Sequence, residues 1–296
     1  MMVLMETTLI YLSLVLIGLC LGSFGGAMVW RLRARQLIQD KAAGEPYDMG
    51  EYNQLKKLTQ KSQLKDRSQC LHCSYALRWY DMVPLASWLT LRGKCRQCRT
   101  PIGYLEPLME LGVALFFVVS FTFWPYGLES IPEIARFVTW LVAGVGLAIL
   151  FAYDAKWYLL PDRVSLTVVA LGILSAALVV IQSTDVPSTL VSIAGSVFVL
   201  SGIYYVLYLV SKGRWIGFGD IKLGLGLALL LSDWKLAFIA LFTANFIGCL
   251  IVIPAMLAGK LQRSSHVPFG PLLILGAIIA ALAGPWLVQT YLFGLI

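Results

Sequence analysis

Long apolar runs separated by short polar segments recur along nearly the whole chain. A run of about 18 or more apolar residues is long enough for an α-helix to cross the hydrocarbon core of a membrane. We therefore predict eight helices, at residues 8–30, 105–124, 134–153, 163–182, 188–210, 219–232, 235–258 and 269–293. The run at 219–232 is short and rich in glycine and leucine, so we expect it to be tilted or only partly inserted.

One long polar interruption separates the first apolar run from the others. It predicts three domains: a first transmembrane helix at residues 1–30, a basic domain at 31–104 and a membrane-embedded domain at 105–296. Residues 36–69 show little apolar periodicity and indicate a solvated insertion, with some helix expected around residues 51–64.

The first run is expected to remain as a helix rather than to be cleaved as a signal peptide. It is long, no basic segment precedes it, and Arg31, Arg33 and Arg35 follow it at once. The composition agrees with a membrane protein. Hydrophobic residues make up 59% of the 296 residues and charged residues only 13%, whereas a soluble domain has about a quarter charged residues.

The positive charge gathers on one side of the predicted helices. Residues 31–105 hold 14 of the 23 lysines and arginines. If this segment is cytoplasmic, the alternation of the helices places 21 of the 23 in the cytoplasm and only Arg136 and Lys235 outside, in agreement with the positive-inside rule. The net charge of +7 is then expected to attract anionic membrane lipid, and we expect no nucleic-acid partner.

Four of the six cysteines have the spacing of a metal site. Cys70 and Cys73 form one pair with two intervening residues, and Cys95 and Cys98 form another. This is the spacing of a zinc ribbon, in which four thiolates close a tetrahedral site around a structural Zn²⁺. Disulfides, redox chemistry or no metal are the alternatives, but a cytoplasmic segment is reducing.

Cys20 and Cys249 lie inside apolar runs, where we expect small buried side chains. The predicted fold is thus all-α, a polytopic integral membrane protein of about eight transmembrane helices with a cytoplasmic zinc-binding module after the first.

Two carboxylates stand at the ends of apolar runs, where ionisable groups are costly. Asp154 closes one run, and Asp220 opens another within Gly217-Phe218-Gly219-Asp220. The charge count places both at the cytoplasmic boundary, and Gly217 and Gly219 would allow a substrate to approach closely. Of two adjacent carboxyl groups one keeps its proton, so that the pair can activate water and polarise a peptide carbonyl. The alternative is that each is a solvated residue at a helix end. Asp162, which follows a proline, is a third candidate and is expected to cap the next helix.

Other hydrolytic chemistries lack their residues. The only histidines are His72 and His266, which leaves no plausible Ser/His/Asp set. No glycine-rich phosphate loop with a lysine is present either.

Fragments along almost the whole chain resemble the bacterial type IV prepilin peptidases, which are GxGD aspartyl proteases. The matching fragments are Leu21-Gly22-Ser23-Phe24, the two cysteine pairs, Val83-Pro84-Leu85-Ala86-Ser87-Trp88-Leu89, Leu91-Arg92-Gly93-Lys94-Cys95, Pro107-Leu108-Met109-Glu110-Leu111, Asp154 with Leu160-Pro161-Asp162, Gly217-Phe218-Gly219-Asp220 and Val267-Pro268-Phe269-Gly270-Pro271.

This resemblance implies a multi-pass enzyme of the bacterial inner membrane, with Asp154 and Asp220 as its catalytic pair. Such enzymes cleave the leader of prepilins and pseudopilins after a glycine on the cytoplasmic side. They then methylate the new N-terminal residue with S-adenosylmethionine. Glu110, a carboxylate inside an apolar run, is our candidate for the methyl-transfer function, and a structural partner of an arginine is the alternative.

A second hypothesis is a membrane transporter or scaffold whose zinc module docks a cytoplasmic partner. A transporter usually has internal repeats and polar residues at mid-membrane. We find no clear repeat, and the charges cluster at one face.

Overall fold

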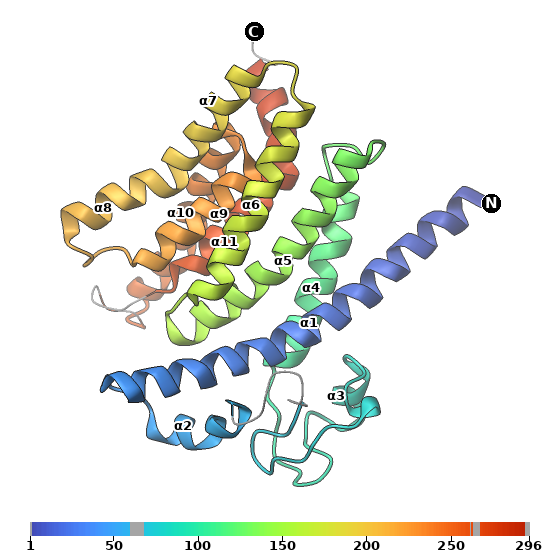
Figure 1. Cartoon of the computed structure of the whole chain (residues 1–296), viewed down its shortest axis with the longest axis vertical. Helices are drawn as coiled ribbons and strands as arrows, with labels where there is room; N and C mark the ends of the chain where they lie inside the picture. The colour runs from blue at the N-terminus through green and yellow to red at the C-terminus, as the bar shows by residue number, and fades with distance from the viewer. Residues whose placement is uncertain (1, 60–67, 261, 263–266, 294–296) are drawn as a thin grey trace. The chain divides into compact units, whose positions relative to one another are not determined.

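The computed structural model describes residues 2–59, 68–260, 262 and 267–293. The regular elements of this part of the chain are all helices, and two isolated β-bridges are its only strand-like pairings, which confirms the predicted all-α class. The chain divides into two compact units, which we call the N-terminal unit (Met1–Val118) and the C-terminal unit (Val119–Ile296). Figure 1 shows the first in blue to green and the second in green to red.

The described residues of the N-terminal unit form four short helices and two long ones. Its helices are α1 (Met2–Ala43), α2 (Met49–Leu55), η1 (Lys56–Thr59), η2 (Trp79–Asp81), α3 (Ala86–Thr90) and α4 (Leu105–Thr122), the last of which ends beyond the unit boundary.

A row of glycines brings α1 against α4. Gly18, Gly22 and Gly26 are four residues apart and therefore lie on one face of α1. A Cβ added at Gly22 would lie 2.5 Å from the carbonyl oxygen of Met109, and one at Gly18 would lie 2.6 Å from the Cα of Ala114. The two backbones are therefore in direct contact, which is the packing that small residues allow between helices in membranes.

The first helix is much longer than predicted. Its 42 residues span about 63 Å at 1.5 Å per residue, roughly twice the thickness of the hydrocarbon core. The predicted end of the first helix at residue 30 is therefore wrong, because residues 31–43 continue α1.

This extension of α1 is helical because one of its faces is covered. Ala34 and Leu37 form a buried cluster with Leu55 of α2, and Arg33 donates a hydrogen bond of 2.7 Å to Glu51. Of the helix expected around residues 51–64, α2 and η1 account for 51–59, and residues 60–64 lie outside the described part.

The C-terminal unit is a bundle of long helices around one short helix. Its helices are α5 (Ile131–Trp157), α6 (Asp162–Gln182), α7 (Val186–Val197), the π-helical turn η3 (Phe198–Gly202), α8 (Ile203–Ser211), α9 (Phe218–Leu231), α10 (Trp234–Leu257), α11 (Phe269–Leu287) and the π-helical turn η4 (Val288–Phe293). The short helix α9 contacts α6, α7, η3, α8, α10 and α11.

Glycines on α9 allow these neighbours to approach closely. A Cβ at Gly224 would collide with the carbonyl oxygen of Leu200 in η3, and one at Gly226 would lie 2.9 Å from a methyl group of Val168 in α6. The buried residues of α9 occupy most of its circumference, and Lys222, Leu225 and Leu229 on the remaining face are partly buried. Protein rather than lipid therefore surrounds the helix that begins with the Gly-x-Gly-Asp motif.

Seven helices of the described residues are long and apolar enough to cross a membrane, namely Glu6–Ala43, Leu105–Thr122, Ile131–Trp157, Asp162–Gln182, Val186–Ser211, Trp234–Leu257 and Phe269–Thr290. The eighth predicted span is α9, whose 14 residues reach only about 21 Å. A helix is present at each of the eight predicted positions. Seven of them are long enough to span a membrane, and the eighth, α9, is the one that we expected to be only partly inserted.

The expectation that Cys20 and Cys249 are buried is wrong. Both side chains are exposed on the surface of the protein, in α1 and α10. A helix that crosses a membrane can turn apolar residues outward, because the surrounding lipid is as apolar as a protein interior.

The close contact between α1 and α4 predicts a selective effect of one methyl group. Gly22→Ala should lower the stability of the protein by about 1–3 kcal/mol, the usual cost of overpacking, because the new Cβ meets the backbone of α4. Gly112→Ala is the matched control, since a Cβ at Gly112 in α4 meets nothing within 4 Å. Thermal unfolding in detergent measures both variants, and equal melting temperatures for the two would contradict this packing.

Candidate active site and metal centre

Asp154 lies in the last turn of α5, where the chain leaves the helix. Tyr158 ends α5 in the left-handed conformation, with φ of 57°, and its backbone N–H donates to the Asp154 carbonyl at 2.9 Å. The Asp154 side chain is buried, with 6% of the residue's surface exposed. It accepts a hydrogen bond of 3.0 Å from the backbone N–H of Gly270. A buried carboxyl group thus obtains its partner from a residue 116 positions away in the chain.

Gly270 is the residue that makes this contact possible. It lies in the first turn of α11, where backbone N–H groups have no partner within the helix and favour a negative charge. A Cβ at position 270 would lie 2.7 Å from the Asp154 carboxyl oxygen, so any other residue would collide with it. Sequence reasoning noted Gly270 only as part of a matching fragment. The prolines on both sides of Phe269-Gly270 mark a helix start and were the available signal.

Asp220 lies in the first turn of α9. Its backbone N–H donates to the Gly217 carbonyl at 3.2 Å, and its side chain is partly buried. The carboxyl groups of Asp220 and Asp154 are close enough to interact electrostatically. Helix α11 packs against both α5 and α9. The structure therefore brings together the two aspartates that the sequence singled out.

The two glycines before Asp220 have different surroundings. A Cβ at Gly219 would lie 3.1 Å from the Cβ of Leu160, so that glycine lets the start of α9 approach the segment that follows α5. Gly217 precedes α9 in an extended conformation, and a Cβ there would face the Asp220 carboxyl group at 3.5 Å. Both glycines thus keep side chains away from the neighbourhood of the aspartates.

Asp162, the third candidate, has another partner. It is the first residue of α6 and is 65% exposed in its side chain, and its carboxyl group accepts a hydrogen bond of 2.6 Å from the Lys222 ammonium. This ion pair joins the start of α6 to the first turns of α9. Asp162 thus lies at the start of the next helix, but the capping position is Pro161 and no side-chain capping hydrogen bond is formed, so the expectation that Asp162 caps the helix is wrong.

Tyr204 is a polar neighbour of Asp220 that sequence reasoning missed. The residue is 6% exposed, and its hydroxyl makes no hydrogen bond of good geometry to any described residue. Asp220 and Asn245 are its polar neighbours, and its ring packs edge-on against Phe269, with centroids 5.5 Å apart. The π-helical turn η3 immediately precedes it, and such turns occur frequently at functional sites.

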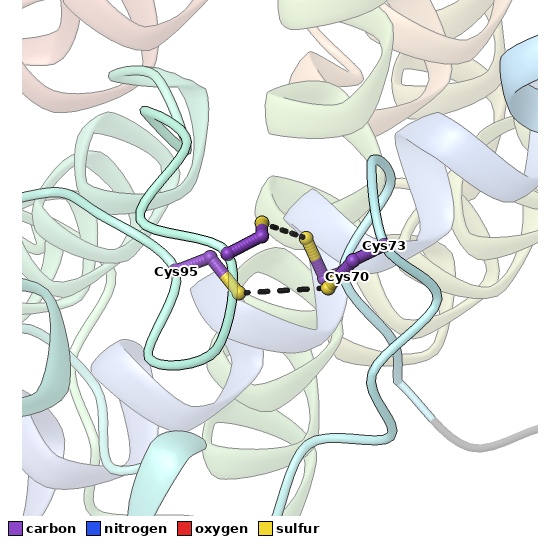
Figure 2. Close-up of side chains that lie close together, drawn as sticks. Cys70, Cys73 and Cys95 are labelled. Carbon is purple, nitrogen blue, oxygen red and sulfur yellow. Dashed lines mark hydrogen bonds between the residues drawn. The ribbon is translucent and has the colours of Figure 1, made fainter.

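The four predicted metal ligands come together in the N-terminal unit. The sulfur atoms of Cys70, Cys73, Cys95 and Cys98 all lie within 4.8 Å of one another. Figure 2 shows the sulfurs facing each other from two loops, and both marked separations, Cys70–Cys98 and Cys73–Cys95, are 3.9 Å. Tetrahedral Zn²⁺ with bonds of about 2.3 Å places its sulfur ligands about 3.8 Å apart. These sulfur separations fit a zinc ion and are far too long for disulfide bonds.

The two loops that carry the cysteines repeat the same backbone contacts. In the first loop, the N–H of Ser74 donates to the Cys70 carbonyl and the N–H of Cys70 donates to the Tyr75 carbonyl. In the second loop, Arg99 and Cys95 make the corresponding bonds, the latter to the Thr100 carbonyl. Ser74 and Arg99, each directly after the second cysteine of its pair, are left-handed, with φ of 59° and 58°. The duplicated geometry presents the two sulfur pairs to each other.

The thiols differ in their acidity. Hydrogen bonds from the hydroxyl and the backbone N–H of Thr100 lower the pKa of Cys98 to about 6, so its thiolate is favoured at neutral pH. Burial raises the pKa of Cys70 to about 12. His72, between the first two cysteines, is exposed.

Glu110 lies on α4 within the N-terminal unit and is buried, at 6% exposure. Its carboxyl oxygen accepts a hydrogen bond of 2.7 Å from the backbone N–H of Leu85. Leu85 has the unusual conformation φ 55°, ψ −46°, which this hydrogen bond holds. Glu110 therefore has a strained backbone segment as its partner. Among the described residues, no arginine forms an ion pair with Glu110, so the structure does not support the alternative of an arginine partner.

Comparison with known proteins connects both units to one family. Residues 16–124 match the model of the bacterial peptidase A24 N-terminal domain, and residues 141–253 match that of the type IV leader peptidase family. No solved structure matches the chain.

Relatives that carry the name prepilin leader peptidase/N-methyltransferase match most of the chain. The protein of Aeromonas salmonicida is 30% identical over 96% of this chain and 94% of its own length. That of Aeromonas hydrophila is 32% identical over 76% of this chain and 74% of its own length, and that of Pseudomonas aeruginosa is 28% identical over 95% and 93%. The two aspartates at helix ends in one unit, the four-cysteine cluster in the other, and the matches to both domain models and to these relatives lead to one conclusion: this chain belongs to the type IV leader peptidase family.

Proposed function

We propose that this chain cleaves the leader peptide from type IV prepilins and pseudopilins after a glycine, with Asp154 and Asp220 as its catalytic residues. The observation that carries the proposal is the meeting of these two carboxyl groups at the ends of α5 and α9. It agrees with the family to which the chain belongs. A transporter or scaffold function is not favoured, because it would leave this pair and the family match without an explanation.

The chemistry follows from two carboxyl groups that share one proton. The ionised carboxylate accepts a proton from water while the carboxylic acid donates a hydrogen bond to the scissile carbonyl. The resulting hydroxide attacks the carbonyl carbon, and the nitrogen of the leaving amine takes up a proton as the C–N bond breaks. The Gly270 N–H orients Asp154 throughout. This route needs neither a metal nor a nucleophilic side chain.

The substrate explains why the pair stands at the ends of apolar helices. A prepilin has a basic leader followed by an apolar helix, so that its scissile bond lies at the membrane boundary. We propose that this boundary is the cytoplasmic face of the bacterial inner membrane. The concentration of lysine and arginine in residues 31–105 supports this orientation through the positive-inside rule.

We further propose that the chain methylates the new N-terminal residue with S-adenosylmethionine, as the names of its relatives suggest. The donor supplies the methyl group, and the N-terminal unit is the part of the chain that we assign to this reaction. The four cysteines hold a structural Zn²⁺ in our proposal, because a site closed by four thiolates leaves no position for a substrate.

Removing either carboxylate should abolish leader cleavage. Asp154→Asn and Asp220→Asn keep the size of the side chain and remove the acid/base function, so the cleavage rate should fall by about 10²- to 10⁴-fold in each. The double variant should be hardly slower than either single variant, because the pair acts as one unit. Cleavage of a purified prepilin, followed by gel electrophoresis and mass spectrometry, measures the rates.

The control for these variants is Asp185→Asn, which changes an exposed aspartate that caps α7 and retains a good capping residue. It should cleave at the wild-type rate. Full processing by either Asp154→Asn or Asp220→Asn would remove the aspartates from the mechanism.

The buried hydroxyl of Tyr204 should contribute to substrate positioning beside Asp220. Tyr204→Phe keeps the ring contact with Phe269 and removes the hydroxyl, which has no protein partner of good geometry to lose. Loss of one such hydrogen bond to a bound peptide corresponds to about 1 kcal/mol, or roughly a fivefold fall in kcat/KM, with an unchanged melting temperature. Tyr205→Phe, on the neighbouring and more exposed position, is the control. Equal kinetics for Tyr204→Phe and wild type would show that the hydroxyl plays no part.

Zinc should be bound at one ion per chain and lost on substitution of a ligand. Cys95→Ser changes the most buried of the four cysteines and should remove most of the metal measured by inductively coupled plasma mass spectrometry, with a lower melting temperature. Cys249→Ser, distant in sequence and outside the cluster, should retain the full zinc content. A wild-type protein that is purified without chelators and contains no zinc would disprove the metal site.

A further inference from the structure

The N-terminal unit contains a cavity of about 540 Å³ whose lining residues all belong to that unit. This volume is in the range of small-molecule sites, which extends over roughly 300–1,000 Å³. Its walls come from three parts of the chain: the middle of α1, the start of α4, and the loops that carry the cysteine pairs. Representative lining residues from these three parts are Ser23, Trp30, Glu106, Glu110, Cys70 and Cys95.

Two carboxyl groups on one face of α4 line this cavity. Glu106 and Glu110 are four residues apart and therefore project from the same side of the helix. Gly26 and Gly22 of α1 lie opposite them: added Cβ atoms there would lie 3.7 Å from the Cα of Glu106 and 2.6 Å from that of Glu110. The glycine row of α1 thus makes room for this acidic face of α4.

Both carboxyl groups are fixed by hydrogen bonds from outside their own helix. Glu106 accepts one of 3.0 Å from the indole N–H of Trp30, and Glu110 accepts one of 2.7 Å from the N–H of Leu85. Leu85 is strained, and strain of this kind concentrates at ligand and active sites. Carboxylates held in place along an enclosed wall are suited to a ligand that carries positive charge.

The other charged groups on the wall leave this acidic character in place. Asp81 is paired with Arg96 at 2.7 Å. Burial raises the pKa of Asp81, but the hydrogen bonds from Arg96 and from the backbone N–H of Arg78 outweigh it and hold the pKa below its usual range. These two charges neutralise each other. Arg31 also lines the cavity.

Aromatic side chains complete the wall. The indoles of Trp30 and Trp88 and the ring of Phe24 line the cavity, and flat apolar rings bind heterocycles by stacking and cations by their π-electron faces. A ligand that matches these features has a cationic centre and a heterocycle. Lipid phosphate does not match, because Glu106 and Glu110 repel it.

We propose that this cavity is the binding site of the methyl donor S-adenosylmethionine, with Glu106 and Glu110 facing its cationic groups. This inference rests on the methyl-transfer function proposed above and gives that function a location. We assign the cavity to the donor rather than to the methyl acceptor, because the acceptor, a pilin N-terminus, is attached to a long apolar helix and the volume of about 540 Å³ is that of a small-molecule site. Cys70 and Cys95 are part of the wall, so the zinc module shapes one side of the donor site.

Direct binding to the purified full-length, zinc-loaded protein in detergent tests the proposal. The probes are tritiated S-adenosylmethionine in equilibrium dialysis and S-adenosylhomocysteine in calorimetry. Glu110→Gln retains an oxygen that can accept the Leu85 N–H and loses the charge, so its affinity for S-adenosylmethionine should fall at least about tenfold. S-adenosylhomocysteine has the same shape without the sulfonium charge and should be affected less. Glu106→Gln should behave like Glu110→Gln.

Glu45→Gln, an exposed glutamate of the same unit that does not line the cavity, is the matched control and should bind as the wild type does. Zinc content and thermal unfolding establish that each variant is folded. Because both glutamine variants keep the hydrogen-bonding shape of the side chain, reduced binding in a folded, zinc-loaded variant supports the site.

Failure of this inference can be told apart from failure of the proposed function. If wild type adds a methyl group to mature pilin while both glutamine variants bind the donor as tightly as wild type, the donor site lies elsewhere and the proposed function stands. If wild type cleaves prepilin but neither binds the donor nor methylates, the methyl-transfer proposal falls, and this inference falls with it.

Discussion

Direct contact between helix backbones is the constraint on which the rest of this structure depends. Helices surrounded by lipid gain nothing from hiding apolar side chains from water, so their association relies on close packing. Gly22 allows it between α1 and α4, Gly224 between α9 and η3, and Gly276 between α11 and α10, where a Cβ would meet the Ala240 carbonyl oxygen. In each unit, a helix placed in this way carries an acidic residue proposed to act in the chemistry.

The short helix α9 illustrates how packing and chemistry combine. An apolar helix of 14 residues cannot cross a membrane by itself, yet the helices around it provide the apolar surroundings that it needs. Its first turn belongs to a helix that six neighbouring elements contact. Asp220 therefore stands on a rigid element, and Asp154 is fixed by Gly270 of another. Precise positions of this kind are what acid/base catalysis requires.

Local patterns were sufficient to predict the helices, the four-cysteine cluster and the approach of Asp154 to Asp220. Apolar runs indicate helices directly, and the spacing of the two Cys-x2-Cys pairs indicates a metal site. The count of positive charges predicted that both aspartates lie at one face of the membrane. The roles of Gly270, Tyr204 and Glu106 could not be predicted, because each depends on a contact with a distant segment. The continuation of α1 to Ala43 was missed for the same reason, since it depends on the packing of Ala34 and Leu37 against Leu55 of α2. The assignment of the aspartates and cysteines to their chemical roles remains a prediction.

The left-handed residues Ser74 and Arg99 bear on the order in which the chain is assembled. Neither is a glycine, and this conformation disfavours other residues by about 1–2 kcal/mol each. Four-thiolate zinc binding releases about 10–16 kcal/mol in small peptides, which exceeds this strain many times over. In the proposed zinc site, the binding energy of the ion would hold both turns in this conformation. Metal capture would then be the event that completes the folding of the N-terminal unit.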